Sequence, residues 1–203
     1  MKIIYALALS LSALLSSFAY AQSEAEQEPE PETLVFSDTL SYDDITKITQ
    51  FRGNVILTRG LFRLTSDNLD IVEDAEGFRH GTATMNSPAL VELIEENLEN
   101  YELVRAFGLE AEYNGKTEVV TMVGQAVVTR YVCGLPVDSV RGEKVVYDSK
   151  NKTYEALGGP QSTQPGRVRS LVQPRSKADK ALEECRVKYN GEPMPSSIQT
   201  PEI

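Results

Sequence analysis

The 203-residue chain contains no tryptophan, two cysteines and a single histidine, His80. With one imidazole and no Cys-x-x-Cys pair, too few side chains are present for a zinc site or for histidine-based acid–base catalysis. A Gly-x-Ser-x-Gly elbow and a phosphate-binding loop are also absent. The carboxylates fall mostly at alternate or turn positions, which is typical of a solvated face and not of a glycosidase pair. The sequence therefore indicates no enzyme and no cofactor, and His80 is expected to face solvent at a turn.

Basic side chains are scarce as well. Twenty lysines and arginines stand against 30 aspartates and glutamates, and the formal net charge is −10. Residues 33–159 hold 12 basic and 20 acidic side chains, whereas the segment from Pro160 onward holds 7 and 5. No basic stripe is present that could displace the counterions of a nucleic acid. A nucleic-acid partner is therefore not expected.

The longest apolar run lies at the N-terminus. Its positive start, the apolar stretch over residues 3–15 and the small-x-small site Ala19-Tyr20-Ala21 predict a signal peptide over residues 1–21, cleaved after Ala21. The competing interpretation is a membrane anchor, but serines interrupt the run and polar sequence follows it. Five glutamates and two prolines in residues 22–32 predict a disordered acidic leader. We expect export to a bacterial periplasm.

The two cysteines, Cys133 and Cys185, would meet an oxidising compartment there. An even count in such a compartment predicts a disulfide that closes a loop of about 50 residues. Two unpaired thiols are the alternative.

A short passage recurs 71 residues later in the chain. Its two copies align without a gap and share five residues, namely Tyr42/Tyr113, Thr46/Thr117, Gly53/Gly124, Thr58/Thr129 and Arg59/Arg130. Between Leu34 and Leu157 apolar residues recur with period two, most clearly at Phe107, Leu109, Ala111 and Tyr113, as half-buried antiparallel strands require. The glycines of the repeat fall where bends or bulges are needed. The sequence thus predicts an all-β sandwich, roll or barrel made of repeated units.

Two segments depart from this pattern. Residues 88–107 can be interpreted as a helix, or as two strands, Ala89–Ile94 and Glu102–Tyr113, joined by the acidic turn Glu95–Asn100; period-two residues on both sides favour the strands. In the tail, apolar positions at helical spacing predict a helix over about 176–189, capped by Ser176 and ended by Asn190-Gly191.

The apolar face of the predicted strands mixes large and small side chains. It could form an ordinary filled core, or a slot wide enough for alkyl chains, and alternation alone leaves both possibilities open. The positions that alternation places on this face are Val55, Leu57, Phe62, Leu64, Leu69, Ile71, Leu109, Ala111, Ala126, Val128, Val145 and Tyr147.

The order of several short motifs resembles the LptA family of periplasmic lipopolysaccharide-transport proteins, the OstA-like group. These motifs are Phe51-Arg52-Gly53-Asn54-Val55-Ile56-Leu57-Thr58-Arg59-Gly60, Leu64-x-x-Asp67-x-Leu69-x-Ile71-Val72, Ser87-Pro88-Ala89, Ala111-x-Tyr113, Val119-Val120-x-Met122-x-Gly124-x-Ala126-x-Val128 and Arg141-Gly142-Glu143-Lys144-Val145-Val146-Tyr147. Each motif is weak alone, but their order and spacing are specific, and the resemblance covers about residues 33–171.

The resemblance implies a twisted β-jellyroll of about sixteen antiparallel strands, without catalysis or cofactors. It implies binding of lipopolysaccharide through lipid A, with Val35, Val91 and Tyr113 at positions that contact lipid. It also implies the partners LptC at the inner membrane and LptD at the outer membrane, and head-to-tail assembly of copies. A structural or carbohydrate-binding β-repeat protein with a filled core remains the alternative function.

Two features depart from the family pattern. They are the insertion Tyr131–Pro136, which carries Cys133, and the predicted helix around Cys185. A bridge between these cysteines would hold the helix over one end of the roll and limit growth of an assembly there. The expected organisation is a signal peptide at 1–21, a leader at 22–32, the jellyroll at 33–172 and a tail with a helix at 173–203.

Overall fold

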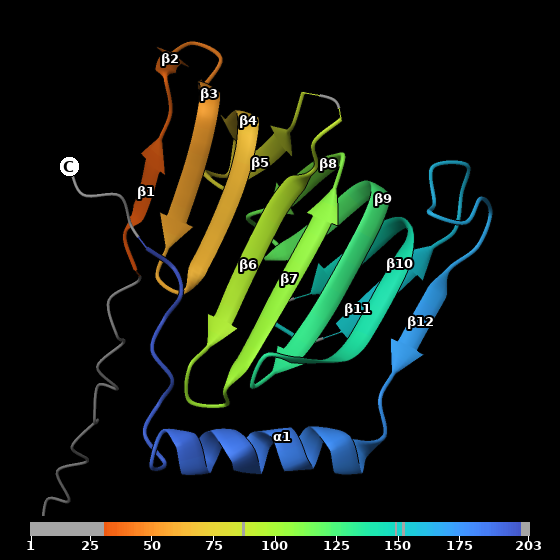
Figure 1. Ribbon diagram of the computed structural model, residues 1–203. Helices are drawn as coiled ribbons and strands as arrows, with labels where there is room; N and C mark the ends of the chain where they lie inside the picture. The colour runs from red at the N-terminus through yellow and green to blue at the C-terminus, as the bar shows by residue number, and fades with distance from the viewer. Residues whose placement is uncertain (1–30, 87, 149, 152, 200–203) are drawn as a thin grey trace, which may run out of the picture. The chain divides into compact units, whose positions relative to one another are not determined.

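The computed structural model describes residues 31–199 except 87, 149 and 152, so the predicted signal peptide and most of the acidic leader lie outside the described residues. The described part contains twelve strands and one helix, coloured along the chain in Figure 1. The elements are β1 (Thr33–Phe36), β2 (Thr39–Asp43), β3 (Ile48–Arg59), β4 (Phe62–Glu73), β5 (Arg79–Thr84), β6 (Val91–Asn97), β7 (Glu102–Gly108), β8 (Glu110–Asn114), β9 (Val119–Val132), β10 (Leu135–Asp148), β11 (Thr153–Leu157), β12 (Arg169–Val172) and α1 (Arg175–Lys188).

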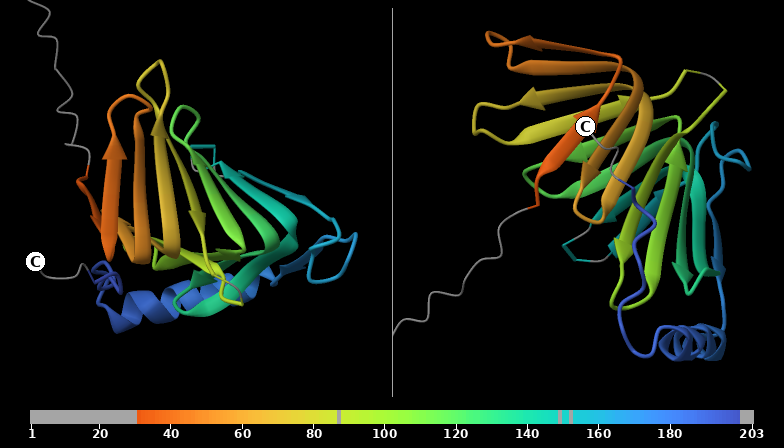
Figure 2. Two further views of the ribbon diagram at one scale, coloured as in Figure 1. Left: turned by 90° about the horizontal axis from the view of Figure 1, so that it is seen from above. Right: turned by 60° about the vertical axis from the view of Figure 1, so that its left-hand side comes forward.

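The strands form two antiparallel layers that share four long strands. In sheet I the order is β2-β3-β4-β5-β8-β9-β10-β11, and in sheet II it is β1-β3-β4-β6-β7-β9-β10-β12. The strands β3, β4, β9 and β10 pass from one layer to the other, and the line along which they do so is the bend of the roll. Opposite the bend, the layers end in separate hairpin turns, so the roll is open on that side (Figure 2).

The predicted count of about sixteen strands is wrong, because the described residues form twelve. Each sheet has eight strand positions, and each of the four long strands fills one position in both sheets. The backbone ladder continues through the glycine bends of β3 and β9, because a bulge redirects a strand without ending it. The all-β jellyroll class and the C-terminal helix are confirmed.

The bulges sit at the two matching glycines of the sequence repeat. In β3, Gly53 and Asn54 have φ values of +78° and +48°; in β9, Gly124 and Gln125 have +69° and +52°. These left-handed conformations favour glycine at the first position. At both bulges the glycine carbonyl accepts a 2.9 Å hydrogen bond from a residue at which the neighbouring chain crosses between the sheets, Asp38 at the first and Leu109 at the second. The repeat is therefore one bend motif used twice.

The predicted strand Glu102–Tyr113 is divided in the structure. Strand β7 pairs with β6 and β9 in sheet II, and β8 pairs with β5 and β9 in sheet I. The chain crosses at Leu109, so the alternation shifts by one residue there: Ala106 is buried and Phe107 carries the Arg105 guanidinium over its ring. The preference for two strands over a helix in residues 88–107 is confirmed.

The helix α1 begins at Arg175, one residue before the predicted cap. Pro174 occupies the N-cap position without a side-chain hydrogen bond, so the predicted cap by Ser176 is wrong. Pro174 has φ of −54° and ψ of 136°, so the chain is still extended there and the first helical turn starts at Arg175. The predicted C-terminal signal is confirmed: Asn190 has φ of +54°, and Gly191 and Asn190 donate to the carbonyls of Arg186 and Val187.

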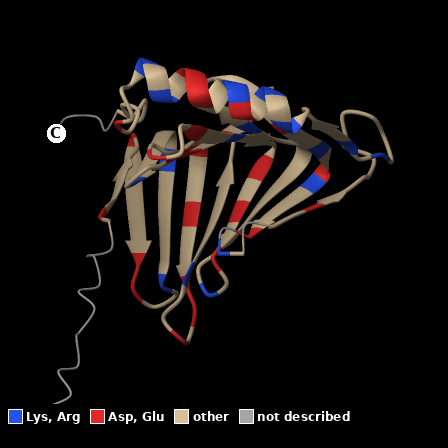
Figure 3. Cartoon of the chain, turned by 90° about the horizontal axis from the view of Figure 1, so that it is seen from below, with Lys and Arg blue, Asp and Glu red and all other residues tan. Residues whose placement is uncertain are grey.

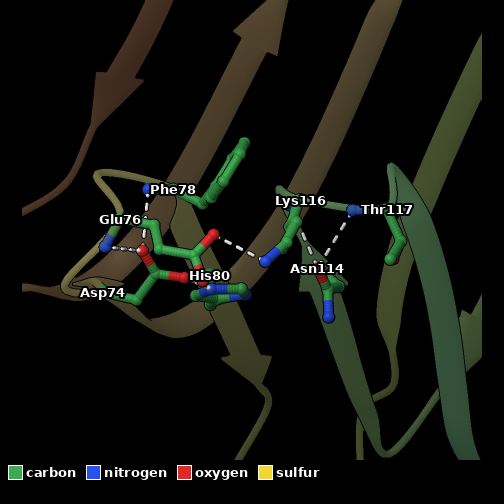
Figure 4. A network of polar contacts seen from close by, with 7 residues as sticks. All are labelled: Asp74, Glu76, Phe78, His80, Asn114, Lys116 and Thr117. Carbon is green, nitrogen blue, oxygen red and sulfur yellow. Dashed lines mark hydrogen bonds and ion pairs between the residues drawn. The ribbon is translucent and has the colours of Figure 1, made fainter.

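Side chains tie together two hairpin turns of sheet I (Figure 4). The Asp74 carboxylate accepts the backbone N–H groups of Glu76 and Phe78 and lies 2.8 Å from His80 Nε2. The hydrogen bond with His80 lowers the pKa of Asp74. Lys116 of the next turn reaches Glu76 at 2.6 Å. His80 therefore lies in β5, partly buried and bonded to Asp74 of the preceding turn, whereas the sequence predicted that it faces solvent at a turn.

The substitution Gly124→Ala tests the bulge. A Cβ atom there would lie 2.7 Å from Leu109 Cδ1, whereas at Gly134, which also has positive φ, it would meet nothing within 4 Å. Gly134→Ala is expected to lower the free energy of unfolding by about 1 kcal/mol through backbone strain, and Gly124→Ala by roughly 1–3 kcal/mol more. Urea unfolding of both variants measures the difference, and equal losses would contradict the close packing at the bulge.

Candidate functional site

The inner faces of the two sheets enclose an apolar trough. Twelve of the fifteen predicted lining residues belong to one cluster of buried and partly buried side chains contributed by both sheets. They are Val35, Val55, Leu57, Phe62, Leu64, Leu69, Ile71, Val91, Ala111, Ala126, Val128 and Val145. Alternation thus located ten of these inner-face residues and the resemblance located Val35 and Val91, while contact of any of them with a ligand stays a prediction.

Exposure within the trough increases from the bend toward the open side. Val55, Val91, Ala126 and Val145 are 0% exposed, so not even water reaches them. Leu57, Phe62 and Ile71 are only partly buried, as are Val104, Val120 and Val140, which the sequence analysis did not select. The base of the trough is therefore filled core, and its open side presents an accessible apolar surface. The two interpretations that the sequence left open apply to different parts of the same face.

The other three predicted residues lie outside this cluster. Leu109 marks the crossing between sheets and packs against Gly124. Tyr113 is partly buried on β8 opposite Gly81. Tyr147 stacks on Tyr154 with ring centroids 4.8 Å apart.

Burial, together with the negative charges of Glu95, Asp148 and Glu102, raises the pKa of Tyr147 to about 12. The phenol therefore stays neutral, as a side chain of an apolar wall should.

A row of charged residues edges the trough on sheet II, and the sequence analysis missed its role. Residues paired across the strands place Arg59, Glu95 and Arg130 in one row on the inner side, where they alternate with Phe62 and Val104, two residues beyond Leu57, Leu93 and Val128. Arg59 and Arg130 are equivalent positions of the repeat, and this shared identity was the signal that could have shown the row. Because the row lies between apolar wall and water, it marks where an amphipathic ligand would change from apolar to polar.

Arg130 joins three strands in this row. Its guanidinium contacts Glu102 of β7 and Asp138 of β10, each at 2.6 Å. Burial alone would lower the pKa of Arg130, but the bonds to both carboxylates outweigh it and raise the pKa. The arginine is therefore permanently charged and holds the edge of sheet II together.

The C-terminal segment crosses the hairpin turns of sheet II. Cys185 of α1 is bonded to Cys133 in the β9–β10 turn, with Cα atoms 5.7 Å apart. Ala181 packs with Val132 and Val137 beside that bond. The helix runs beneath the ends of β7, β9 and β10 in Figure 1. Figure 3 colours the charged residues along it, and the side chains of Arg175, Asp179, Lys180 and Glu184 among them are largely exposed. The helix was expected to cover one end of the roll. This expectation is wrong, because the helix is anchored at the β9–β10 turn, and neither β9 nor β10 is an edge strand of the sheet.

Residues 189–198, which we term the strap, continue from α1 along the β6–β7 turn. Tyr189 stacks on Tyr101, and the Tyr101 hydroxyl donates to the Glu192 carbonyl at 2.9 Å. The Met194 N–H donates to the Leu98 carbonyl at 3.1 Å. These contacts give the strap a defined path.

Glu96 anchors the far end of the strap. The carboxylate is only 5% exposed and accepts the hydroxyls of Ser196 and Ser197 and the Ser197 N–H. Burial alone would raise the pKa of Glu96, but these hydrogen bonds outweigh it and lower the pKa. The strap is therefore bound to a charged carboxylate.

Residues 31–199, apart from the three gaps, contain no group of three or more His, Cys, Asp or Glu that could hold a metal ion. Within the same residues, no helix has the length and apolarity needed to cross a membrane. A trough that is apolar inside and charged at its edge suits an amphipathic ligand. Fold and site thus define a binding and carrier protein of the β-jellyroll class.

Comparison with known proteins identifies the family. The family model described as "LptA/(LptD N-terminal domain) LPS transport protein" matches residues 34–153, and the chain belongs to this family of lipopolysaccharide-transport proteins. The lipopolysaccharide export system protein LptH of Pseudomonas aeruginosa is 28% identical over 147 residues, which are 71% of this chain and 80% of that protein.

A solved structure agrees with the family assignment. The crystal structure of LptH, described as the LptA-homologous periplasmic component of the lipopolysaccharide transport device, superposes with a TM-score of 0.61 at 25% identity. The superposition covers 71% of this chain and 96% of LptH. The alternative of a structural or carbohydrate-binding protein is not favoured.

The attachment of the strap should depend on pH. Because the folded pKa of Glu96 lies below its ordinary value of 4.5, the attachment contributes stability above that pH and loses it as the pH falls through the lowered pKa. Hydrogen exchange of the Ser197 amide measures it, and the protection factor, which is taken relative to the slow intrinsic exchange of amides in acid, is expected to fall there. Glu96→Gln should lower this protection factor already at neutral pH, while Glu99→Gln in the exposed turn should not. Unchanged protection in Glu96→Gln would contradict the anchoring role.

Proposed function

We propose that the mature protein acts in the periplasm as a bridge that carries lipopolysaccharide between the two membranes. One observation carries this proposal: the partly exposed apolar side of the trough runs the length of a roll whose two ends are open sheet edges. Family membership and the likeness to periplasmic LptH support it. The signal peptide, residues 1–21, is removed after Ala21, residues 33–172 form the carrier roll, and residues 173–203 form an extension.

The acyl chains of lipid A would lie along the open side of the trough. Each methylene moved out of water contributes about 0.8 kcal/mol, so a chain of about a dozen methylenes gains on the order of 10 kcal/mol. In this proposal the acyl chains contact Val35, Leu57, Phe62, Ile71 and Tyr113 directly. The sugars would stay in water beyond the charged row.

The fully buried residues at the bend take a different role. Val55, Val91, Ala126 and Val145 have no exposed surface, so they contact lipid only if the sheets separate. They support the wall on which the acyl chains lie. This divides the predicted lining set into a contacting part and a supporting part.

The partners follow from the two open ends. In this proposal LptC at the inner membrane and LptD at the outer membrane each add a strand to a free sheet edge, and copies of the chain join head to tail between them. A roll whose ends do not close on each other forms a linear assembly.

Site-specific photocrosslinking tests cargo binding. A photoreactive residue at Tyr113, which faces the trough, should crosslink to lipopolysaccharide, while the same residue at neighbouring Glu112, which is exposed, should not. Mass spectrometry of the purified wild-type protein should detect bound lipid A. Equal crosslinking at both positions, or no lipid A with either method, would refute transport through the trough.

A further inference from the structure

The two halves of the described chain are copies of one six-stranded unit. Strands β1 to β3 correspond to β7 to β9 with a shift of 71 residues, and β4 to β6 correspond to β10 to β12 with a larger shift, because the β9–β10 hairpin is longer than the β3–β4 hairpin and β10 contains a second bulge. Equivalent contacts occur in both halves. Asp67 of β4 accepts the N–H of Asn86 at 2.8 Å, and Glu143 of β10 accepts the N–H of Gln161 at 2.9 Å, each from the connection that follows.

The copies meet in the middle of the chain through two strand pairs. In sheet I, β5 pairs with β8, with Thr82 opposite Glu112 and Ala83 opposite Ala111. In sheet II, β6 pairs with β7, with Leu93 opposite Ala106. These four inner residues, Ala83, Ala111, Leu93 and Ala106, are at most 4% exposed. The trough therefore passes from the first half of the chain to the second half without interruption.

The outer ends of the chain present the unpaired equivalents of these strands. At the C-terminal end β11 corresponds to β5 and β12 to β6; at the N-terminal end β2 corresponds to β8 and β1 to β7. Among the described residues, none of the four has a strand on its outer side. The lengths match, with five residues in both β2 and β11 and four in both β1 and β12.

Apolar side chains are exposed at both of these ends. Leu40 is 61% exposed on β2 and Val172 is 70% exposed on β12. Both belong to the inner face, because Leu40 pairs with Phe51, and Val172 pairs with Asp138, which itself lies opposite Arg130 of the charged row. Such residues at a sheet edge require either protection or a partner strand.

We propose that a second copy of this chain docks on the first in the register of the internal junction. The inference rests on the head-to-tail assembly in the proposed function and specifies it residue by residue. In sheet I, Leu157, Ala156, Glu155, Tyr154 and Thr153 lie opposite Thr39, Leu40, Ser41, Tyr42 and Asp43 of the second copy. In sheet II, Val172, Leu171, Ser170 and Arg169 lie opposite Thr33, Leu34, Val35 and Phe36 of the second copy.

This register keeps the trough continuous between molecules. It sets Leu40 opposite Ala156, as Ala111 lies opposite Ala83, and it brings Tyr42 and Tyr154 together as a cross-strand aromatic pair. A slip of one residue would turn the inner residues of the added strands outward. The same constraint that aligns the two halves within a chain thus selects one register between chains.

The C-terminal extension leaves the docking edge accessible. After Val172 the chain turns back beneath its own sheet II, where the Cys133–Cys185 bond and the strap hold it (Figure 1). At the internal junction the corresponding position is occupied by the β6–β7 turn, through which the chain continues into its own second half. The disulfide therefore keeps the extension away from the β12 edge.

Disulfide crosslinking between single-cysteine variants tests the register. Glu155→Cys and Ser41→Cys change exposed outer-face residues, and the native cysteines are already bonded to each other. Mixed and oxidised without reductant, this pair should form a covalent dimer. Glu155→Cys mixed with Thr39→Cys or with Asp43→Cys should give roughly tenfold less, because cysteines displaced by two residues on a strand are too far apart to bond. The double variant Thr82→Cys/Glu112→Cys is the matched control, since it places cysteines at the equivalent internal pair.

The outcomes separate the register from the carrier function. Equal crosslinking in the displaced pairs, or no crosslinking in any pair while the internal control closes, overturns the proposed register. Lipid A detected in the same protein would leave the carrier function standing in that case. Crosslinking of Glu155→Cys with Ser41→Cys alone, in protein that binds no lipid A, would support the register and refute the carrier function.

Discussion

The bend at Gly53 and at Gly124 is the constraint on which the rest of this structure depends. At each site two consecutive residues adopt positive φ, and the glycine carbonyl accepts the N–H of a residue at which the neighbouring chain crosses between the sheets. One long strand can therefore serve both sheets while its backbone hydrogen bonds continue on either side. Without these bends β3 and β9 would be flat strands of a single sheet, and no trough would form between two inner faces.

The trough shows how one apolar surface can serve stability and binding together. Side chains at the bend have no exposed surface, and those toward the open side are partly exposed. Burial at the bend holds the sheets together, since removing apolar area from water is the main source of folding free energy. The open side can offer apolar surface to a ligand because it is not needed to close the core. A charged row along sheet II, held by Arg130, then limits how far the apolar surface extends.

The C-terminal extension adds a second layer of constraint to the family fold. The family match ends at residue 153, whereas the disulfide, α1 and the strap connect residues beyond it to the turns of sheet II. Closing a loop of 52 residues with a disulfide stabilises a fold by about 4 kcal/mol in the chain-entropy picture. The extension therefore makes the turns of sheet II the more firmly held side of the trough. The turns of sheet I rely on exposed contacts such as Lys116 with Glu76.

Local patterns in the sequence determined the all-β class, the repeat, the inner position of most lining residues and the C-terminal end of the helix, because each depends on neighbours along the chain. Tertiary structure decided the rest. The alternation changes phase at Leu109 because the chain crosses between the sheets there. A two-residue period in the sequence does not reveal where such a crossing occurs. Strands that continue through bulges made the count twelve instead of sixteen. Glu96 meets Ser196 and Ser197 only because the strap returns to a turn about 100 residues earlier in the chain. Which apolar residues remain accessible also depends on the distance between the two sheets. That distance cannot be inferred from a local sequence pattern.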